Sequence, residues 1–170
     1  HSLDRRQRQM CIRDRADTFT IKIVGKGGHA AKPQETIDPI VISSNLVMSL
    51  QSIASRNINP TKDVVVSVCT FQTDTISYNV IPEIVTLKGT LRTFDKEVQN
   101  NAKDKIFLLS KSIAEAYGGK AEIEFNYGYP VMKNSVDDTE IAINVAEKVT
   151  GKKTMNAEKI MGAEAVSYTH

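Results

Sequence analysis

Alternation between apolar and polar residues recurs along this chain and constrains its fold more than any other feature. In 18–24, "TFTIKIV", Phe19, Ile21 and Ile23 fall on one face, and threonine and lysine fall on the other. Alternation or β-branched content predicts three further strands, at 64–73, 84–94 and 120–129. Strands with one apolar face predict a sheet that is covered on one side and open on the other.

Two helical segments lie between these strands. The first begins after Asp38, with proline at its first position, and continues to about Ser55. Its expected apolar stripe comprises Ile40, Val47, Leu50 and Ala54. The second begins after Asp95, keeps a clear amphipathic period and ends at two glycines. The order β-α-β-β-α-β predicts an α+β split βαβ (ferredoxin-like) sandwich, a four-stranded antiparallel sheet with two helices on one face.

The pattern changes after Pro130. The segment 137–151, "DDTEIAINVAEKVTG", predicts a third helix that is capped by Asp137 or Asp138 and ended by Gly151. A closed βαββαβ domain has no obvious place for this helix. We therefore expect one domain at 16–130 and a piece of a second domain at 131–164.

The first fifteen residues differ in composition from the rest of the chain. Five arginines against two aspartates give this segment a charge of +3, whereas the whole chain carries a formal net charge of +2. A basic arm for nucleic acid is one interpretation. The interpretation that we prefer is a non-native or disordered arm at 1–15 and a non-native tail at 165–170, and both are left out of the fold prediction.

Composition narrows the class of protein. The chain has no apolar run near the roughly 18 residues of a membrane span. Its two cysteines do not indicate a disulfide framework, so a cytoplasmic protein is expected. RNA binding on the open sheet face is disfavoured, because that face lacks paired stacking aromatics and carries Glu122 and Glu124.

The first strand leads into "GKGGHAAKP", 25–33, which contains His29, the one histidine away from the chain ends. "GKGGHA" formally matches a dinucleotide fingerprint, but that motif needs a helix to begin within it, and here the helical period starts near Asp38. One internal histidine without a Cys-x-x-Cys pair does not make a zinc site. Cys69 lies in mid-strand and is expected in the core or on the sheet surface.

Several motifs together resemble the lid, or dimerisation, domain of the metal-dependent aminoacylase, hippurate hydrolase and carboxypeptidase-G amidohydrolases. The first two are "GKGGHAAKP" and, about fifty residues later, "YNVIPEIVTLKGTLRTFD". The later "YGYPVMKNS", the third helix and "IMGAE" resemble the return into the catalytic domain of that family. The resemblance extends over residues 16–164 and implies that 131–164 is a fragment of the catalytic domain.

The resemblance implies roles for three residues. The family's loop histidine, matched by His29, reaches across a homodimer and helps to hold the oxyanion of the tetrahedral intermediate. Asn79 and Arg92 match residues that bind the polar or carboxylate end of the substrate. A histidine N–H and the planar donor fork of arginine suit these roles chemically.

The resemblance also implies a function and a cofactor. The parent enzyme would hydrolyse the amide bond of an N-acyl amino acid or a similar small substrate, using a divalent metal such as zinc, manganese or cobalt. The family's metal ligands and catalytic carboxylate lie mainly outside the lid. We therefore expect this fragment to bind no metal and to be inactive alone. The alternative is a stand-alone βαββαβ module that binds a small ligand or another protein without catalysis.

The strand at Val64 to Thr73 is expected to mediate homodimer formation. In a βαββαβ sheet the strand after the first helix lies at an edge, and this one is long, β-branched and free of charge. Two identical edges can pair antiparallel about a two-fold axis. No nucleic acid or membrane partner is expected.

Overall fold

The computed structural model describes residues 15–131 and 135–151. Nearly all of the predicted arm, the predicted tail and the "IMGAE" motif lie outside these residues. Residues Ala16–Tyr129 form one compact unit, and helix α4 belongs to a second unit, so each is treated by itself. The elements of the compact unit begin with β1 and end with β6: β1 (Arg15–Val24), β2 (Gly28–His29), η1 (Pro33–Glu35), α2 (Pro39–Ser52), η2 (Ile53–Asn57), β3 (Val64–Thr73), β4 (Val80–Ile81), β5 (Ile84–Thr93), α3 (Lys96–Ala116) and β6 (Lys120–Asn126).

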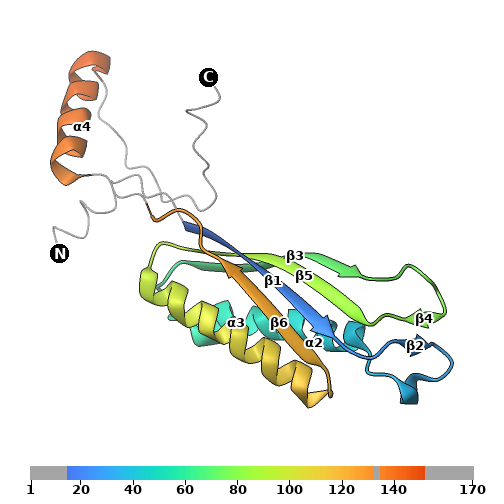
Figure 1. Ribbon diagram of the computed structural model, residues 1–170. Coiled ribbons are helices and arrows are strands. Elements are labelled where there is room, and N and C mark those ends of the chain that lie inside the picture. The colour runs from blue at the N-terminus through green and yellow to red at the C-terminus, as the bar shows by residue number, and fades with distance from the viewer. Residues whose placement is uncertain (1–14, 132–134, 152–170) are drawn as a thin grey trace. The chain divides into compact units, whose positions relative to one another are not determined.

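The main sheet has the strand order β3-β5-β1-β6. β1 pairs antiparallel with β6, and β3 pairs antiparallel with β5. Figure 1 shows α2 and α3 together on one face of this sheet. The predicted α+β sandwich of βαββαβ order is therefore confirmed, with the short pair β2–β4 added beside it.

The core lies between the sheet and the two helices. The predicted inward faces of β1 and β5 are confirmed, since their apolar side chains are almost fully buried. Arg92 lies on the opposite, open face, as the alternation predicts. The buried hydrophobic residues are Phe19, Ile21, Ile23, Ile42, Leu46, Leu50, Ile53, Ile58, Val66, Val85, Leu87, Leu91, Val98, Ala102, Ile106 and Ala114.

The predicted stripe of α2 is partly wrong. Ile40 is exposed and Ala54 lies beyond the helix, whereas Ile42 and Leu46 point into the core. The reason is that α2 carries apolar residues on more than one side, so the pattern alone does not select the side that packs on the sheet.

The predicted helix starts are confirmed at Asp38 and Asp95. The Asp38 side chain accepts a hydrogen bond from the Ile40 N–H at 2.8 Å. The Asp95 side chain accepts hydrogen bonds from the N–H groups of Glu97 and Val98 at 2.9 and 3.4 Å. These bonds satisfy donors that the first turn of a helix leaves unpaired.

Helix α4 (Val136–Thr150) confirms the predicted third helix and its end at Gly151, which has a left-handed φ of 65°. The predicted cap is wrong: Ser135 caps the helix, and its side chain accepts a hydrogen bond from the Asp138 N–H. Asp137 and Asp138 instead occupy the first turn, where their negative charges interact favourably with the positive end of the helix dipole. Within 15–131 and 135–151, none of the helices is long and apolar enough to cross a membrane.

Edge strand β3 carries a bulge that the sequence did not predict. Its position at the edge of the sheet confirms the prediction for Val64–Thr73. The register with β5 shifts between Val68 and Thr70, which leaves Cys69 as the extra residue. A bulge bends an edge strand and interrupts its pairing.

Candidate functional site

His29 lies on the short strand β2, which pairs antiparallel with β4. His29 is opposite Val80 in this ladder, and the Ala30 N–H donates to the carbonyl oxygen of Asn79 at 3.0 Å. Two of the three predicted site residues, His29 and Asn79, are thus neighbours although fifty residues separate them. Figure 1 shows β2 and β4 beyond one end of the main sheet.

The glycines of this loop permit a close approach of backbones. The Lys26 N–H donates to the Ile37 carbonyl at 2.9 Å, and the Ile37 N–H donates to the Lys26 carbonyl at 3.0 Å. A β-carbon on Gly25 would overlap the Ile37 carbonyl oxygen. The glycine at this position is therefore required by packing, and its φ is not positive.

The imidazole of His29 is exposed and is held by its own loop. Its Nδ1 accepts a hydrogen bond from the Ala31 N–H at 3.1 Å. Because a nitrogen that accepts a hydrogen bond carries no proton, the neutral ring has its proton on Nε2. The ring therefore presents an N–H donor to whatever lies beside the loop.

Asn79 follows Tyr78 in the turn before β4, and both side chains are exposed. The loop that carries them is fixed at its base. The Asp74 carboxylate accepts from the Ile84 N–H at 3.1 Å, and the Asp74 N–H donates to the Ile84 carbonyl at 3.2 Å. Asn79 thus lies in an anchored turn, and its backbone is adjacent to that of the His29 loop.

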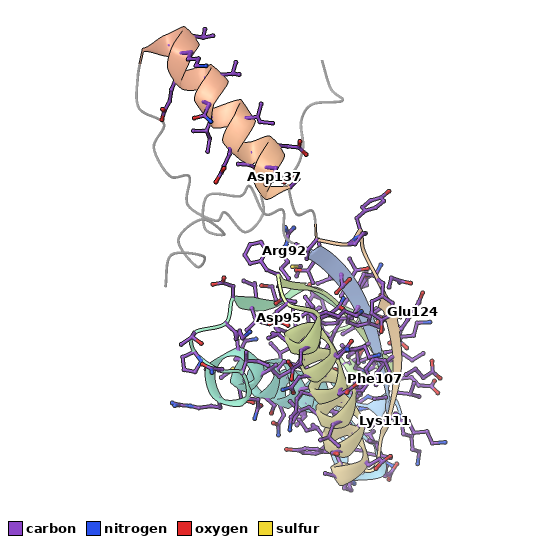
Figure 2. The ribbon with its side chains drawn as sticks, turned by 90° about the vertical axis from the view of Figure 1, so that its left-hand side faces the viewer. Arg92, Asp95, Phe107, Lys111, Glu124 and Asp137 are labelled. Carbon is purple, nitrogen blue, oxygen red and sulfur yellow. The ribbon has the colours of Figure 1, made fainter. Side chains whose placement is uncertain are left out.

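Arg92 lies far from these two residues within one subunit. It is the penultimate residue of β5 and pairs with Val65, whereas β4 precedes the start of β5. Eight residues separate Ile84 from Arg92, which corresponds to roughly 27 Å along a strand. Figure 2 shows Arg92 near Asp95, at the end of β5 that leads into α3. One subunit therefore does not bring Arg92 together with His29 and Asn79.

Sequence reasoning missed a buried carboxylate at the start of β1. Asp17 is fully buried; it accepts from the Gly128 N–H at 2.8 Å and from the side-chain amide of Gln99. The hydrogen bond from Gly128 connects the start of β1 to the segment that follows β6. Asp17 has the same parity as Phe19, Ile21 and Ile23, so the alternation of β1 places it on the inward face. Its partners could not be predicted from local sequence, because Gln99 and Gly128 are distant along the chain.

The described residues contain no metal centre. In 15–131 and 135–151, no group of three histidine, cysteine, aspartate or glutamate side chains is placed to hold a metal ion. Cys69 is an exposed free thiol on β3. The described residues provide three polar groups at the predicted positions. They are the imidazole N–H of His29, the side-chain amide of Asn79 and, at the end of β5 that leads into α3, the guanidinium of Arg92.

Comparison with protein families identifies one match, to the peptidase dimerisation domain of the M20 group, over residues 14–118. The match contains His29, Asn79 and Arg92, and it covers more than half of the chain.

Curated relatives include amide hydrolases. The chain is 34% identical over 151 residues to a hippurate hydrolase of Campylobacter jejuni, covering 88% of this chain and 39% of that protein. It is 42% identical over 123 residues to an N-acyl-L-amino acid amidohydrolase of Geobacillus stearothermophilus, covering 72% of this chain and 33% of that protein. The chain thus spans less than two fifths of the length of these relatives.

Among solved structures, a dinuclear metal-binding peptidase of the M20 family from Bacillus subtilis superposes with a TM-score of 0.70. The two sequences are 28% identical, and the alignment covers 91% of this chain and 37% of that protein.

Proposed function

Because the chain belongs to the M20 peptidase dimerisation-domain family, we propose that it forms the lid of a metal-dependent amidohydrolase. The substrates of that enzyme would be N-acyl amino acids or similar small amides. The match over residues 14–118 carries this proposal, and the amide-hydrolysing activities of the two named relatives support it. In this proposal 16–130 is the lid and 131–164 is a fragment of the catalytic domain.

The metal of the proposed enzyme would be held outside the described residues. The solved relative is a dinuclear metal-binding peptidase, whereas 15–131 and 135–151 provide no cluster of ligands. A divalent metal supplies an activated water and a Lewis acid in such hydrolases. The residues of this chain are therefore assigned only to binding and to charge stabilisation.

His29 is proposed to donate its Nε2–H to the oxyanion that forms when water attacks the amide. The support is the hydrogen bond from the Ala31 N–H to Nδ1, which leaves Nε2 as the donor. A donor that is already oriented stabilises the transition state without reorganisation, and the loss of one such donor typically costs about 10²–10³ in kcat.

A two-fold dimer through β3 would complete the site. When two β3 strands pair antiparallel about their middle, the Thr73 end of one strand lies beside the Val64 end of the other. Since Val65 pairs with Arg92, the Arg92 of the partner subunit would come to the end of the sheet that carries His29. We therefore assign His29 and Asn79 of one subunit and Arg92 of the other to one site, with the amide and guanidinium binding the substrate carboxylate.

Subunit mixing in the complete hydrolase tests this proposal. One inactive variant carries His29→Ala, and the other lacks a metal ligand of the catalytic domain. If His29 serves the active site of its partner, each heterodimer regains one intact site and up to about half of the wild-type activity. Mixtures in which exchange is demonstrated by mass spectrometry, but in which activity stays at the background level, would contradict action across the dimer.

A further inference from the structure

The open face of the sheet, opposite the helices, contains a depression of about 450 Å³. All four strands contribute to it. The two central strands supply a lysine and a threonine each, which are Lys22 and Thr20 on β1 and Lys88 and Thr86 on β5. The outer walls include Asp74, just after β3, and Glu124 on β6. The depression is therefore polar, with ammonium groups at its centre and carboxylates at its sides.

The two lysines at the centre are not paired with a carboxylate of the described residues. In 15–131 and 135–151, neither the Lys22 ammonium nor the Lys88 ammonium makes a hydrogen bond or an ion pair. Glu122 is opposite Lys22 in the β1–β6 ladder, yet the two are not within ion-pair distance. The nearby carboxylates have other partners: Asp74 accepts from the Ile84 N–H, and Glu124 accepts from the Asn126 side-chain amide at 3.3 Å.

We propose that this depression binds the carboxylate of a small organic acid. Two ammonium groups would face the carboxylate, and the hydroxyl groups of Thr20 and Thr86 would donate the additional hydrogen bonds. The flanking Asp74 and Glu124 offset the charges of the two lysines, so a dianion such as phosphate gains little attraction from its additional charge over a monocarboxylate. This site uses none of His29, Asn79 and Arg92 and does not depend on the function proposed above.

An NMR titration of the 170-residue chain tests the proposal. The probe is N-acetylglycine at constant ionic strength, and its neutral analogue N-acetylglycinamide is the ligand control. We expect saturable shifts of the backbone amides around Lys22 and Lys88, with a Kd on the order of millimolar, and none with the neutral analogue. Added salt should weaken binding.

Charge removal identifies the residues responsible. Lys22→Met and Lys88→Met keep the apolar stems, and each should raise the Kd about two- to fivefold. The double variant should raise it at least about tenfold. Lys111→Met is the matched control, since Lys111 lies on α3 (Figure 2). The depression is on the opposite face of the sheet.

Three results would overturn the assignment. They are the absence of saturable shifts in the folded chain, an unchanged Kd in the double variant, and a tighter Kd for inorganic phosphate than for N-acetylglycine. Far-UV circular dichroism of each variant confirms that the fold is retained, which is expected because both lysines are exposed.

Discussion

His29 shows how a short loop can define the chemistry of one side chain. The Ala31 N–H occupies Nδ1, the β2–β4 ladder fixes the backbone of His29, and close packing at Gly25 fixes the entry to the loop. A donor with a defined direction suits a charge that develops in a transition state. The same loop leads only into the short 3-10 helix η1, and α2 begins later, at Pro39, so the loop does not have the geometry of a dinucleotide loop.

Asp95 is expected to make the stability of the domain depend on pH. Its carboxylate accepts a hydrogen bond from the Lys62 ammonium at 2.6 Å and caps α3, and these bonds, that from Lys62 first, lower the pKa of Asp95. A lowered folded-state pKa stabilises the fold above the unfolded pKa of about 3.9, and this contribution is lost as pH falls through the folded value.

Asp95→Ala should therefore lower the free energy of unfolding by about 1 kcal/mol at pH 7, mainly through loss of the cap. Asp95→Asn keeps a capping side chain and should cost less. Urea denaturation at pH 7 and at pH 2.5 measures both. The difference between wild type and Asp95→Asn should shrink at pH 2.5, and a difference that grows on acidification would contradict the assignment.

At the scale of elements, β3 is the strand most suited to contact a second chain. It lies at the sheet edge and is ten residues long, but the bulge at Cys69 divides it into two segments that can pair. Val66 is not suitable for testing this contact, because its side chain is only 7% exposed and packs in the core. Val65 and Phe71 are 37% and 44% exposed and lie on either side of the bulge.

The variant Val65→Lys/Phe71→Lys should weaken dimerisation of the chain at least about tenfold, because lysines on an edge oppose pairing with another edge. Sedimentation velocity over a concentration series measures the dissociation constant. Leu108→Lys, on the exposed side of α3, is the control and should leave it unchanged. A wild-type chain that stays monomeric at about 100 μM would count against dimerisation through β3.

Local patterns explain which elements were predictable. Alternation identified the strands and the inward residues of β1, because one face of the sheet is buried. The pairing of β2 with β4, which joins His29 to Asn79, depends on contacts fifty residues apart and has no periodic signal. The same holds for the bulge at Cys69, which depends on the register with β5, and for the partners of the buried Asp17, which are Gln99 and Gly128.

At the scale of the whole molecule, this chain alone is expected to lack amidohydrolase activity. The proposed enzyme needs a metal to activate water, and the described residues offer no ligand cluster. Purified chain should be assayed on N-acetyl and N-benzoyl amino acids with added zinc, manganese or cobalt. Turnover above background that depends on the metal would refute the proposal that the catalytic machinery lies elsewhere.

The positions of the three proposed site residues predict which pairs of inactive variants rescue each other in the complete hydrolase. His29 and Asn79 are neighbours within one subunit, and Arg92 lies at the other end of β5. If the dimer forms through β3, one site contains His29 and Asn79 of one chain and Arg92 of the other. A heterodimer of His29→Ala with Arg92→Ala then has one site with both changes and one site with neither.

Mixing His29→Ala with Arg92→Ala should therefore restore up to about half of the wild-type activity per heterodimer. Mixing His29→Ala with Asn79→Ala should restore none, because each of the two sites then keeps one defect. The second mixture is the control for the first, since subunit exchange is the same in both. Rescue of His29→Ala by Asn79→Ala but not by Arg92→Ala would contradict this arrangement, because it would mean that His29 shares its site with Arg92 of its own chain. The length of β5 from Ile84 to Arg92, roughly 27 Å, opposes such a site.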